Sequence, residues 1–271
     1  MNNKTETITI FTHLGPVVGK KETNGSYFKG IPYGADTSGK NRWRSPQEPK
    51  PWTEDFDASS FGPQCPQFRM GEGGFRDSIA KAYGVEVPPE EMPIESEDCL
   101  RLNVFSPDTH SKEKLPVMFW IHGGALRYGS GDPYLPEGLL GKDIILVSIN
   151  YRLGELGFFA HPSLKEEGNA TTTNFGLLDQ IKALEWIQKN IENFGGDPSN
   201  VTIFGESAGG LSVAALLVSP LSKGLFHKAI VQSGGFARMS LHAYELNELG
   251  TTGGMLGKSF CNVCGVAEGP D

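Results

Sequence analysis

The hydrophobic and polar positions along the chain follow two periods. From residue 100 onward, short β-rich apolar runs recur at 100–105, 117–121, 144–150, 201–204 and 229–232. Residues 175–194 instead carry apolar side chains at helical spacing, and Gly195 and Gly196 end that stretch. Strands that alternate with helices predict an α/β fold with a mostly parallel central sheet and helices on both of its faces.

The first hundred residues have a different pattern. Short runs at 8–11, 17–20 and 27–31 are separated by glycine turns, which predicts a small N-terminal antiparallel sheet. Residues 34–96 are rich in proline, glycine and charge. They also contain aromatic residues that need burial, so we expect a long irregular wrap rather than a linker. These aromatic residues are Trp43, Trp52, Phe56 and Phe61.

Residues 205–209, Gly-Glu-Ser-Ala-Gly, match the G-x-S-x-G pattern of a nucleophile elbow. The pattern is weak alone in a chain with 35 glycines, but an apolar β-branched run precedes it and a helix-compatible run at 210–218 follows it. Such a strand–turn–helix would hold Ser207 in a strained conformation with its hydroxyl exposed, beside a helix N-terminus that favours negative charge. The alternative is an incidental serine in a glycine-rich turn.

A second glycine segment, His-Gly-Gly-Ala at residues 122–125, follows the predicted strand at 117–121. Acyl transfer builds negative charge on the former carbonyl oxygen, and preorganised backbone N–H groups stabilise that charge. A glycine loop after a central strand can supply two such groups, and the N–H of Ala208 supplies a third. His122 precedes these glycines, which favours a brace for the loop over a general base; a plain turn is the remaining alternative.

Composition narrows the range of partners. With 24 Lys+Arg against 32 Asp+Glu, the net charge of −8 argues against nucleic acid. No apolar run reaches the roughly 18 residues of a membrane span. The first twenty residues lack the apolar core of a secretory signal, which favours a cytoplasmic location and leaves secretion open. Cys261 and Cys264 have no second ligand pair, and we expect neither a metal nor an organic cofactor.

The two glycine motifs and their surroundings resemble the type-B carboxylesterase family of the α/β-hydrolase superfamily. Residues 194–209 resemble the serine signature of that family without a gap, and residues 97–103 resemble its second signature, although Arg101 stands where an aromatic or apolar residue is usual. Shorter matches lie at 30–33, 150–154, 177–180 and 224–229. The resemblance covers nearly the whole chain and implies an α/β-hydrolase fold and hydrolysis of a small carboxylic ester.

By this resemblance, Ser207 is the nucleophile, and the N–H groups of Gly124, Ala125 and Ala208 form the oxyanion hole. Ala125 replaces a third glycine, but its N–H remains available. The resemblance also implies ion pairs for Arg152 with Asp179 and Arg42 with Glu97, a disulfide for Cys65 with Cys99, and a buried polar network for Glu206 with Ser233. In a reducing compartment, the two cysteines would be thiols.

The chain departs from the family in two ways. Residues 85–93 contain no aromatic residue where cholinesterases carry a tryptophan for the choline cation, which argues against a dedicated choline ester substrate. In the family, the triad acid and histidine also lie farther downstream than the 64 residues after Ser207, and neither His227 nor His242 resembles the catalytic histidine. We therefore expect residues 1–271 to be the N-terminal portion of one domain, without the triad acid, the histidine and the C-terminal strands.

Three functions stay open at this point. The first is a carboxylic ester hydrolase that forms an acyl-enzyme on Ser207. The others are a catalytically inactive cholinesterase-like binding module and a short regulatory form of the protein. Inactive members of this fold typically lose the serine, so the presence of Ser207 favours the hydrolase.

Overall fold

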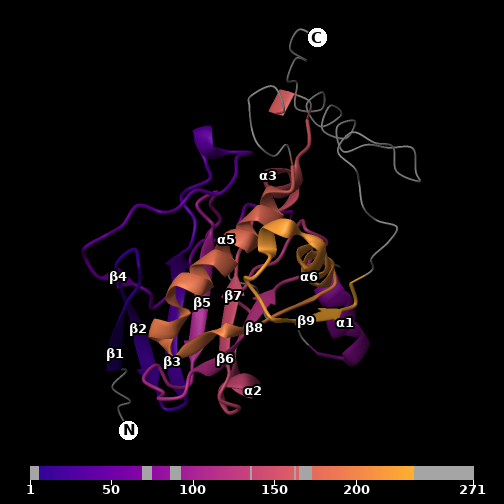
Figure 1. Ribbon diagram of the computed structural model, residues 1–271. Helices are drawn as coiled ribbons and strands as arrows, with labels where there is room; N and C mark the ends of the chain where they lie inside the picture. Colours follow the sequence, from indigo (N-terminus) through magenta and orange to yellow (C-terminus); the bar gives the residue numbers. More distant parts are fainter. Residues whose placement is uncertain are drawn as a thin grey trace.

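The computed structural model describes residues 6–68, 75–85, 93–134, 136–161, 163–164 and 173–234, in which one β-sheet is flanked by helices (Figure 1). Each run predicted as a strand overlaps a strand of this sheet. The strands are β1 Glu6–Phe11, β2 Pro16–Glu22, β3 Gly25–Pro32, β4 Phe56–Asp57, β5 Arg101–Ser106, β6 Leu115–Ile121, β7 Ile145–Ile149, β8 Gly196–Glu206 and β9 Lys228–Gln232.

The strand order is β1-β2-β3-β5-β7-β6-β8-β9, with β4 paired to β2. Neighbouring strands are antiparallel from β1 to β7 and parallel from β7 to β9. The α/β class is therefore as predicted. The antiparallel strands are not a small separate sheet, however, because β3 pairs with β5, for example at Phe28 and Val104, and joins them to the parallel part.

The helices follow the predicted pattern in the second half of the chain. The stretch predicted at 175–194 is α5, Phe175–Asn190, continued by the 3₁₀ turn η2, Ile191–Phe194. Gly195 ends it with a φ of +88°, a left-handed conformation that glycine adopts readily. The other helices are α1 Phe75–Tyr83, α2 Glu137–Leu140, α3 Gly154–Phe158 and α6 Ala208–Val218, with 3₁₀ turns η1 Gly39–Asn41 and η3 Pro220–Ser222.

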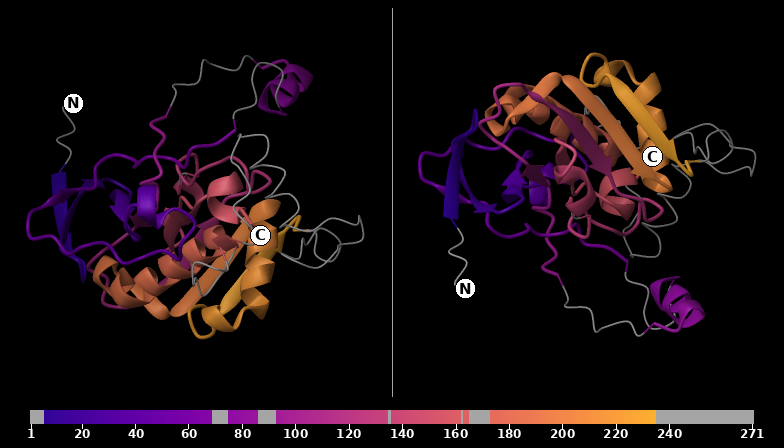
Figure 2. Two further views of the ribbon diagram at one scale, coloured as in Figure 1. Left: turned by 90° about the horizontal axis from the view of Figure 1, so that it is seen from above. Right: turned by 90° about the horizontal axis from the view of Figure 1, so that it is seen from below.

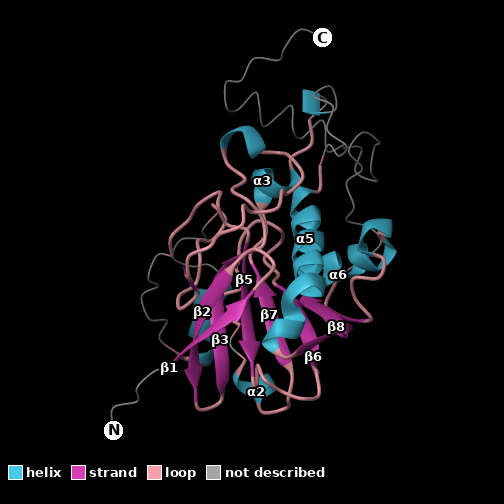
Figure 3. Cartoon of the chain, turned by 60° about the vertical axis from the view of Figure 1, so that its left-hand side comes forward, coloured by secondary structure: helices cyan, strands magenta, loops and turns pink. Residues whose placement is uncertain are grey.

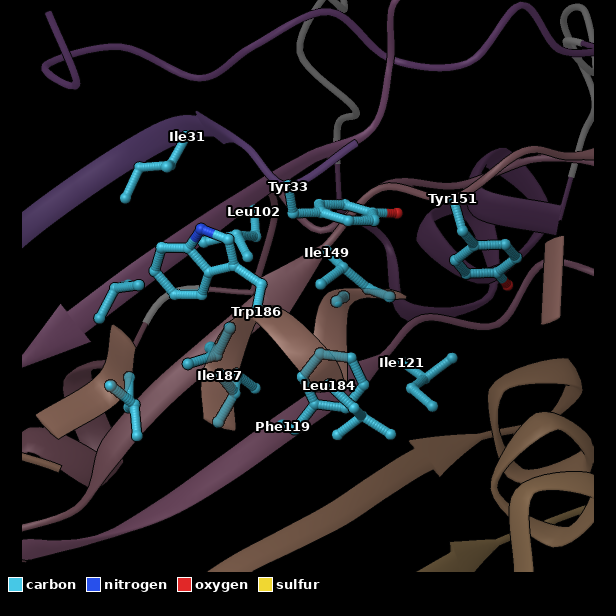
Figure 4. Packing of buried hydrophobic residues seen from close by; sticks show 14 of the residues in the cluster. Ile31, Tyr33, Leu102, Phe119, Ile121, Ile149, Tyr151, Leu184, Trp186 and Ile187 are labelled. Carbon is cyan, nitrogen blue, oxygen red and sulfur yellow. The ribbon is translucent and has the colours of Figure 1, made fainter. Parts of the chain in front are cut away.

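The two long helices lie on the same side of the sheet (Figures 2 and 3). Leu184, Trp186 and Ile187 of α5 pack against the sheet, where Phe119 and Ile149 are fully buried (Figure 4). Val213 and Leu216 of α6 belong to the same cluster. Alternate residues of buried strands point to opposite faces, so this cluster takes one residue in two from each central strand.

The other face of the sheet has a thinner cover in the described residues. Its cluster has three buried members, Phe105, Trp120 and Leu146. Leu139 of the four-residue helix α2 and Phe61 of the wrap pack against them while remaining partly exposed. Within the described part of the chain, the hydrophobic core therefore lies mainly between the sheet and α5 with α6.

The N-terminal wrap is anchored by its aromatic residues, as predicted. The indole N–H of Trp52 donates to the carbonyl of Pro16 at 2.8 Å, and that of Trp43 donates to the carbonyl of Glu155 at 2.8 Å. The Trp43 ring also stacks on Phe159 with centroids 4.7 Å apart. These contacts attach the wrap to β2 and to α3.

β9 is the terminal strand at the parallel end of the sheet in the described residues. Its Ile230 and Val231 are 43% and 40% exposed, and Leu217 and Val218 of the adjacent α6 are exposed as well. In this part of the chain, β9 is therefore an exposed apolar edge of the sheet. An uncovered strand edge of this kind favours pairing with another strand.

Candidate active site

The predicted nucleophile lies at the sharp turn between β8 and α6. Ser207 has a φ of 55° and a ψ of −119°, a conformation that costs a non-glycine residue about 1–3 kcal/mol. The turn is held on both sides, because the Ser207 N–H donates to Gln232 O at 2.9 Å and the Leu211 N–H donates to Ser207 O at 2.9 Å. The strained elbow that the motif predicts is therefore formed.

Two glycines of the motif allow the elbow to approach β6. A Cβ added at Gly209 would collide with the carbonyl oxygen of Ile121, and one added at Gly205 would lie 2.7 Å from the same oxygen. Side chains at these positions would push the start of α6 away from the end of β6. The motif requires glycine here because of this close backbone approach.

The loop after β6 has an unusual backbone of its own. Gly124, Ala125 and Leu126 have φ values of 100°, 54° and 59°. The carbonyl of Gly124 accepts the N–H groups of Arg127 at 2.9 Å and Tyr128 at 3.1 Å, which closes the turn. Residues other than glycine rarely adopt the left-handed conformation. Contacts with the surrounding residues therefore hold this loop, rather than the backbone preference of its own residues.

The loop and the elbow lie against each other. A Cβ added at Gly123 would be 2.7 Å from Glu206 O and 3.3 Å from the Cβ of Ser207. Among the described residues, no acceptor pairs with the N–H groups of Gly124, Ala125 or Ala208. The structure thus places the predicted oxyanion loop beside the predicted nucleophile, with three unpaired backbone donors in that region.

His122 is enclosed beneath this loop. Its side chain is 1% exposed, and its Nδ1 lies 2.8 Å from Gly123 O. A carbonyl oxygen only accepts, so the ring is the tautomer with the proton on Nδ1. Burial lowers the pKa of His122 to about 4, which leaves the ring neutral near pH 7. This geometry agrees with a brace for the loop.

Further support comes from the segment after β7. The Tyr151 hydroxyl donates to His122 O at 2.8 Å, and the two rings stack 4.4 Å apart. The next residue, Arg152, forms the predicted ion pair with Asp179, with N–O distances of 2.8 and 2.6 Å in full burial. Gly154 donates its N–H to Leu126 O at 2.7 Å. The ion pair therefore fixes a segment that holds the loop directly.

The other implied pairs are present in different forms. Arg42 and Glu97 form a two-bonded ion pair at the edge of the wrap. Cys65 and Cys99 are free, buried thiols in hydrogen-bond contact, which together with burial raises the pKa of Cys99 well above its usual value. The Leu153 N–H donates to Cys65 Sγ at 3.3 Å.

Within the described residues, Glu206 and Ser233 do not form the buried network that the resemblance implies. Both are exposed, and no hydrogen bond joins their side chains to another described residue. They lie at the carboxyl ends of β8 and β9, where the described part of the chain provides no covering layer.

No hydrogen bond joins a histidine of the described residues to Ser207. His227 lies at the start of β9, at the opposite end of the strand pair from Ser207, and its Nδ1 accepts the Val201 N–H at 3.2 Å. His13 contacts Asn190, the last residue of α5, and Glu48 of the wrap. His242, Cys261 and Cys264 lie outside the described residues, as do the carboxylates beyond residue 234.

No group of three or more His, Cys, Asp and Glu residues is placed to hold a metal ion in the described ranges. None of the helices described there combines the length and the apolar character that crossing a bilayer requires.

Sequence reasoning missed two glutamines that contact the segment after the predicted oxyanion loop. Gln67 pairs with the backbone of Gly129, and Gln64 donates to Ser130 Oγ at 2.9 Å and Asp132 Oδ2 at 2.8 Å. Both lie in the irregular wrap, more than sixty residues from their partners. No local motif could have identified them.

The elbow, the glycine loop and the sheet together have the arrangement of an α/β-hydrolase fold. The family profile described as "Carboxylesterase family" matches residues 6–262. The chain belongs to the carboxylesterase family, and its fold is the α/β-hydrolase fold, as predicted.

Individual relatives agree with this assignment. The chain is 44% identical over 258 residues to the para-nitrobenzyl esterase of Bacillus subtilis (strain 168). The matched region is 92% of this chain and 49% of that protein. The chain is 45% identical over 214 residues to the fumonisin B1 esterase of Sphingopyxis macrogoltabida, covering 78% and 37%. A thermophilic PNB esterase structure has a TM-score of 0.79 at 42% identity, covering 96% and 49%. The chain thus spans about half the length of these relatives or less.

Proposed function

We propose that this chain carries the nucleophile and the oxyanion hole of a carboxylic ester hydrolase. The observation that carries the proposal is the placement of the glycine loop against the strained Ser207, with a Cβ added at Gly123 only 3.3 Å from the Ser207 Cβ. Membership of the carboxylesterase family supports the reaction class. The substrate is a small carboxylic ester.

In the proposed reaction, the Ser207 hydroxyl attacks the ester carbonyl and forms a tetrahedral intermediate. Its negative oxygen accepts hydrogen bonds from the N–H groups of Gly124, Ala125 and Ala208, each worth about 2.7–4 kcal/mol in the barrier. The alcohol then leaves with a proton, and the acyl group remains on Ser207. Water attacks this ester and releases the carboxylic acid.

The general base and its carboxylate partner come, in this proposal, from outside the described residues. Two features support this. Among the described histidines, His122 donates to Gly123 O and is neutral, whereas His227 lies at the wrong end of β9. The Ser207 hydroxyl also has no hydrogen-bond partner within the described part of the chain. Because His242, like His227, does not resemble the catalytic histidine of the family, we also expect the 271-residue chain alone to lack useful turnover.

Hydrolysis of a short-chain p-nitrophenyl ester tests this proposal. Without a base, the oxyanion hole and substrate binding leave about 10³–10⁴-fold acceleration over water. We expect a rate far below that of a complete triad, and because this residual acceleration does not need the serine, it should be similar in Ser207→Ala and in the control Ser219→Ala. Turnover above about 1 s⁻¹ that Ser207→Ala abolishes would show that the chain contains a base. The nucleophile itself is tested by fluorophosphonate modification of Ser207, and a chain that is not modified there would contradict it.

A further inference from the structure

A side chain from the N-terminal wrap holds the segment that follows the oxyanion loop. Gln67 Oε1 accepts the Gly129 N–H at 2.7 Å, and Gln67 Nε2 donates to Gly129 O at 3.2 Å. Nε2 also donates to Cys65 O at 3.1 Å. Because both carbonyls can only accept, the side-chain amide has one orientation that satisfies all three contacts. Gln67 therefore binds both backbone groups of Gly129, as a neighbouring strand would.

Gly129 in turn lies directly against His122. Its φ is +111°, and a Cβ added there would be 2.6 Å from His122 Nδ1 and 3.0 Å from Gly123 O. These are the two atoms that form the 2.8 Å hydrogen bond beneath the loop. The Gly129 backbone thus closes one side of the space in which that bond forms.

Tyr151 closes another side of the same space. Its ring stacks on His122, and its hydroxyl donates to His122 O. In the described residues, His122 Nε2 has no hydrogen-bond partner. The imidazole is therefore held in place by packing and by the bond from Nδ1, and movement of Gly129 would release it on one side.

The bond to Gly123 O determines the direction of a predicted oxyanion donor. Gly123 C=O and Gly124 N–H are the two ends of one planar peptide group, and the described residues contain no cis peptide bond. In a trans peptide, the N–H points opposite to the C=O. Hence His122, by fixing where Gly123 O points, also fixes where the Gly124 N–H points.

We propose that Gln67 is a positioning residue for the oxyanion hole. It holds Gly129 against His122, which keeps Gly123 O bonded and the Gly124 N–H aimed at the reacting carbonyl. The effect on catalysis rests on the proposed function, because it requires that Gly124 donates to the oxyanion. The effect on the geometry of the loop does not require it.

The test uses Gln67→Met, which keeps the length of the side chain and removes its hydrogen bonds. Gln47→Met is the matched control, because the Gln47 amide is exposed and donates to Ser45 O in its own loop. NMR of the 271-residue chain reports the ring nitrogens of His122. It also reports hydrogen exchange at Arg127 and Tyr128, whose N–H groups bond to Gly124 O. Labelling of Ser207 by a fluorophosphonate reports the chemistry.

In Gln67→Met, we expect His122 to lose its single Nδ1–H signature and the Arg127 and Tyr128 amides to exchange at least about tenfold faster, with β6 and β7 unchanged. Labelling should slow by about tenfold, a fraction of the effect of losing one oxyanion donor. Gln47→Met should match the unsubstituted chain in all three measurements.

Three results would overturn the proposal: an unchanged His122 signature, faster exchange spread evenly over β6 and β7, or an unchanged labelling rate. The proposed function has a separate failure. If Ser207 is not labelled even in the unsubstituted chain while Gln67→Met alters the loop, Gln67 positions the loop as inferred, and the hydrolase assignment is wrong.

Discussion

The candidate site has two walls, the loop after β6 and the carboxyl ends of β8 and β9. They differ in how many contacts hold their residues in place. The proposed oxyanion loop after β6 is enclosed: His122, Tyr151, Arg152 and Asp179 are all at most 2% exposed, and each has a partner that fixes it. At the carboxyl ends of β8 and β9, by contrast, Glu206, Ser207 and Ser233 are exposed. The described residues therefore supply the contacts that hold the proposed oxyanion donors in place. They do not supply a base that would activate Ser207.

Breaking the ion pair beneath the oxyanion wall should have the largest effect on stability. Asp179→Ala leaves the Arg152 guanidinium buried without its carboxylate, and such a loss costs about 3–5 kcal/mol. Urea unfolding measures this. Glu97→Ala is the matched control, because its partner Arg42 is 41% exposed and such pairs contribute about 1 kcal/mol or less. Equal losses of unfolding free energy in the two variants would show that the buried ion pair stabilises the fold no more than the exposed one.

Acid should weaken the same wall through His122. Burial lowers its pKa from 6.5 to about 4, so the unfolded chain binds the proton first as the pH falls. The folded state then loses stability between about pH 6.5 and pH 4, by up to roughly 3 kcal/mol. Urea unfolding of the unsubstituted chain and His122→Gln at several pH values isolates this contribution. If the free energies of unfolding of the two proteins change with pH in parallel across this range, His122 does not titrate as inferred.

The contact between the two walls can be tested at Gly209. In Gly209→Ala, the new Cβ would meet Ile121 O, and the backbone shift that relieves the clash should cost about 1–3 kcal/mol. Gly138→Ala in α2 is the control, since a Cβ there meets nothing within 4 Å. Thermal unfolding of the two variants measures the difference. A harmless Gly209→Ala would mean that the elbow and β6 are not in close contact.

The exposed edge should matter more for association than for stability. Ile230→Lys places a charge on the uncovered strand β9 and should change the free energy of unfolding by at most about 0.5 kcal/mol. It should also reduce self-association, because a charged edge strand pairs poorly. Size-exclusion chromatography compares it with Val85→Lys, which replaces an exposed residue away from the sheet. If the unsubstituted chain is already a monodisperse monomer, edge pairing does not occur.

The sequence predicted the parts of this molecule that have a local signal. The apolar period predicted α5, and the glycines at 205 and 209 predicted the elbow, because a close backbone approach excludes every other side chain. The continuous sheet was not predicted, since the pairing of β3 with β5 joins segments 69 to 80 residues apart, from Pro32 with Arg101 to Ser26 with Ser106. Gln67 was missed for a similar reason: an amide that binds a distant backbone leaves no pattern in the sequence.

The central claim is that Ser207 is a nucleophile beside a preformed oxyanion hole, and the modification of Ser207 tests it most directly. The chain is incubated with a fluorophosphonate for hours, and the modified residue is located by mass spectrometry, with Ser207→Ala and Ser219→Ala as paired controls. Because the label is irreversible, a slow reaction without a base still accumulates. We expect one label on Ser207, absent in Ser207→Ala and unchanged in Ser219→Ala. No label, or one that persists in Ser207→Ala, would contradict the claim.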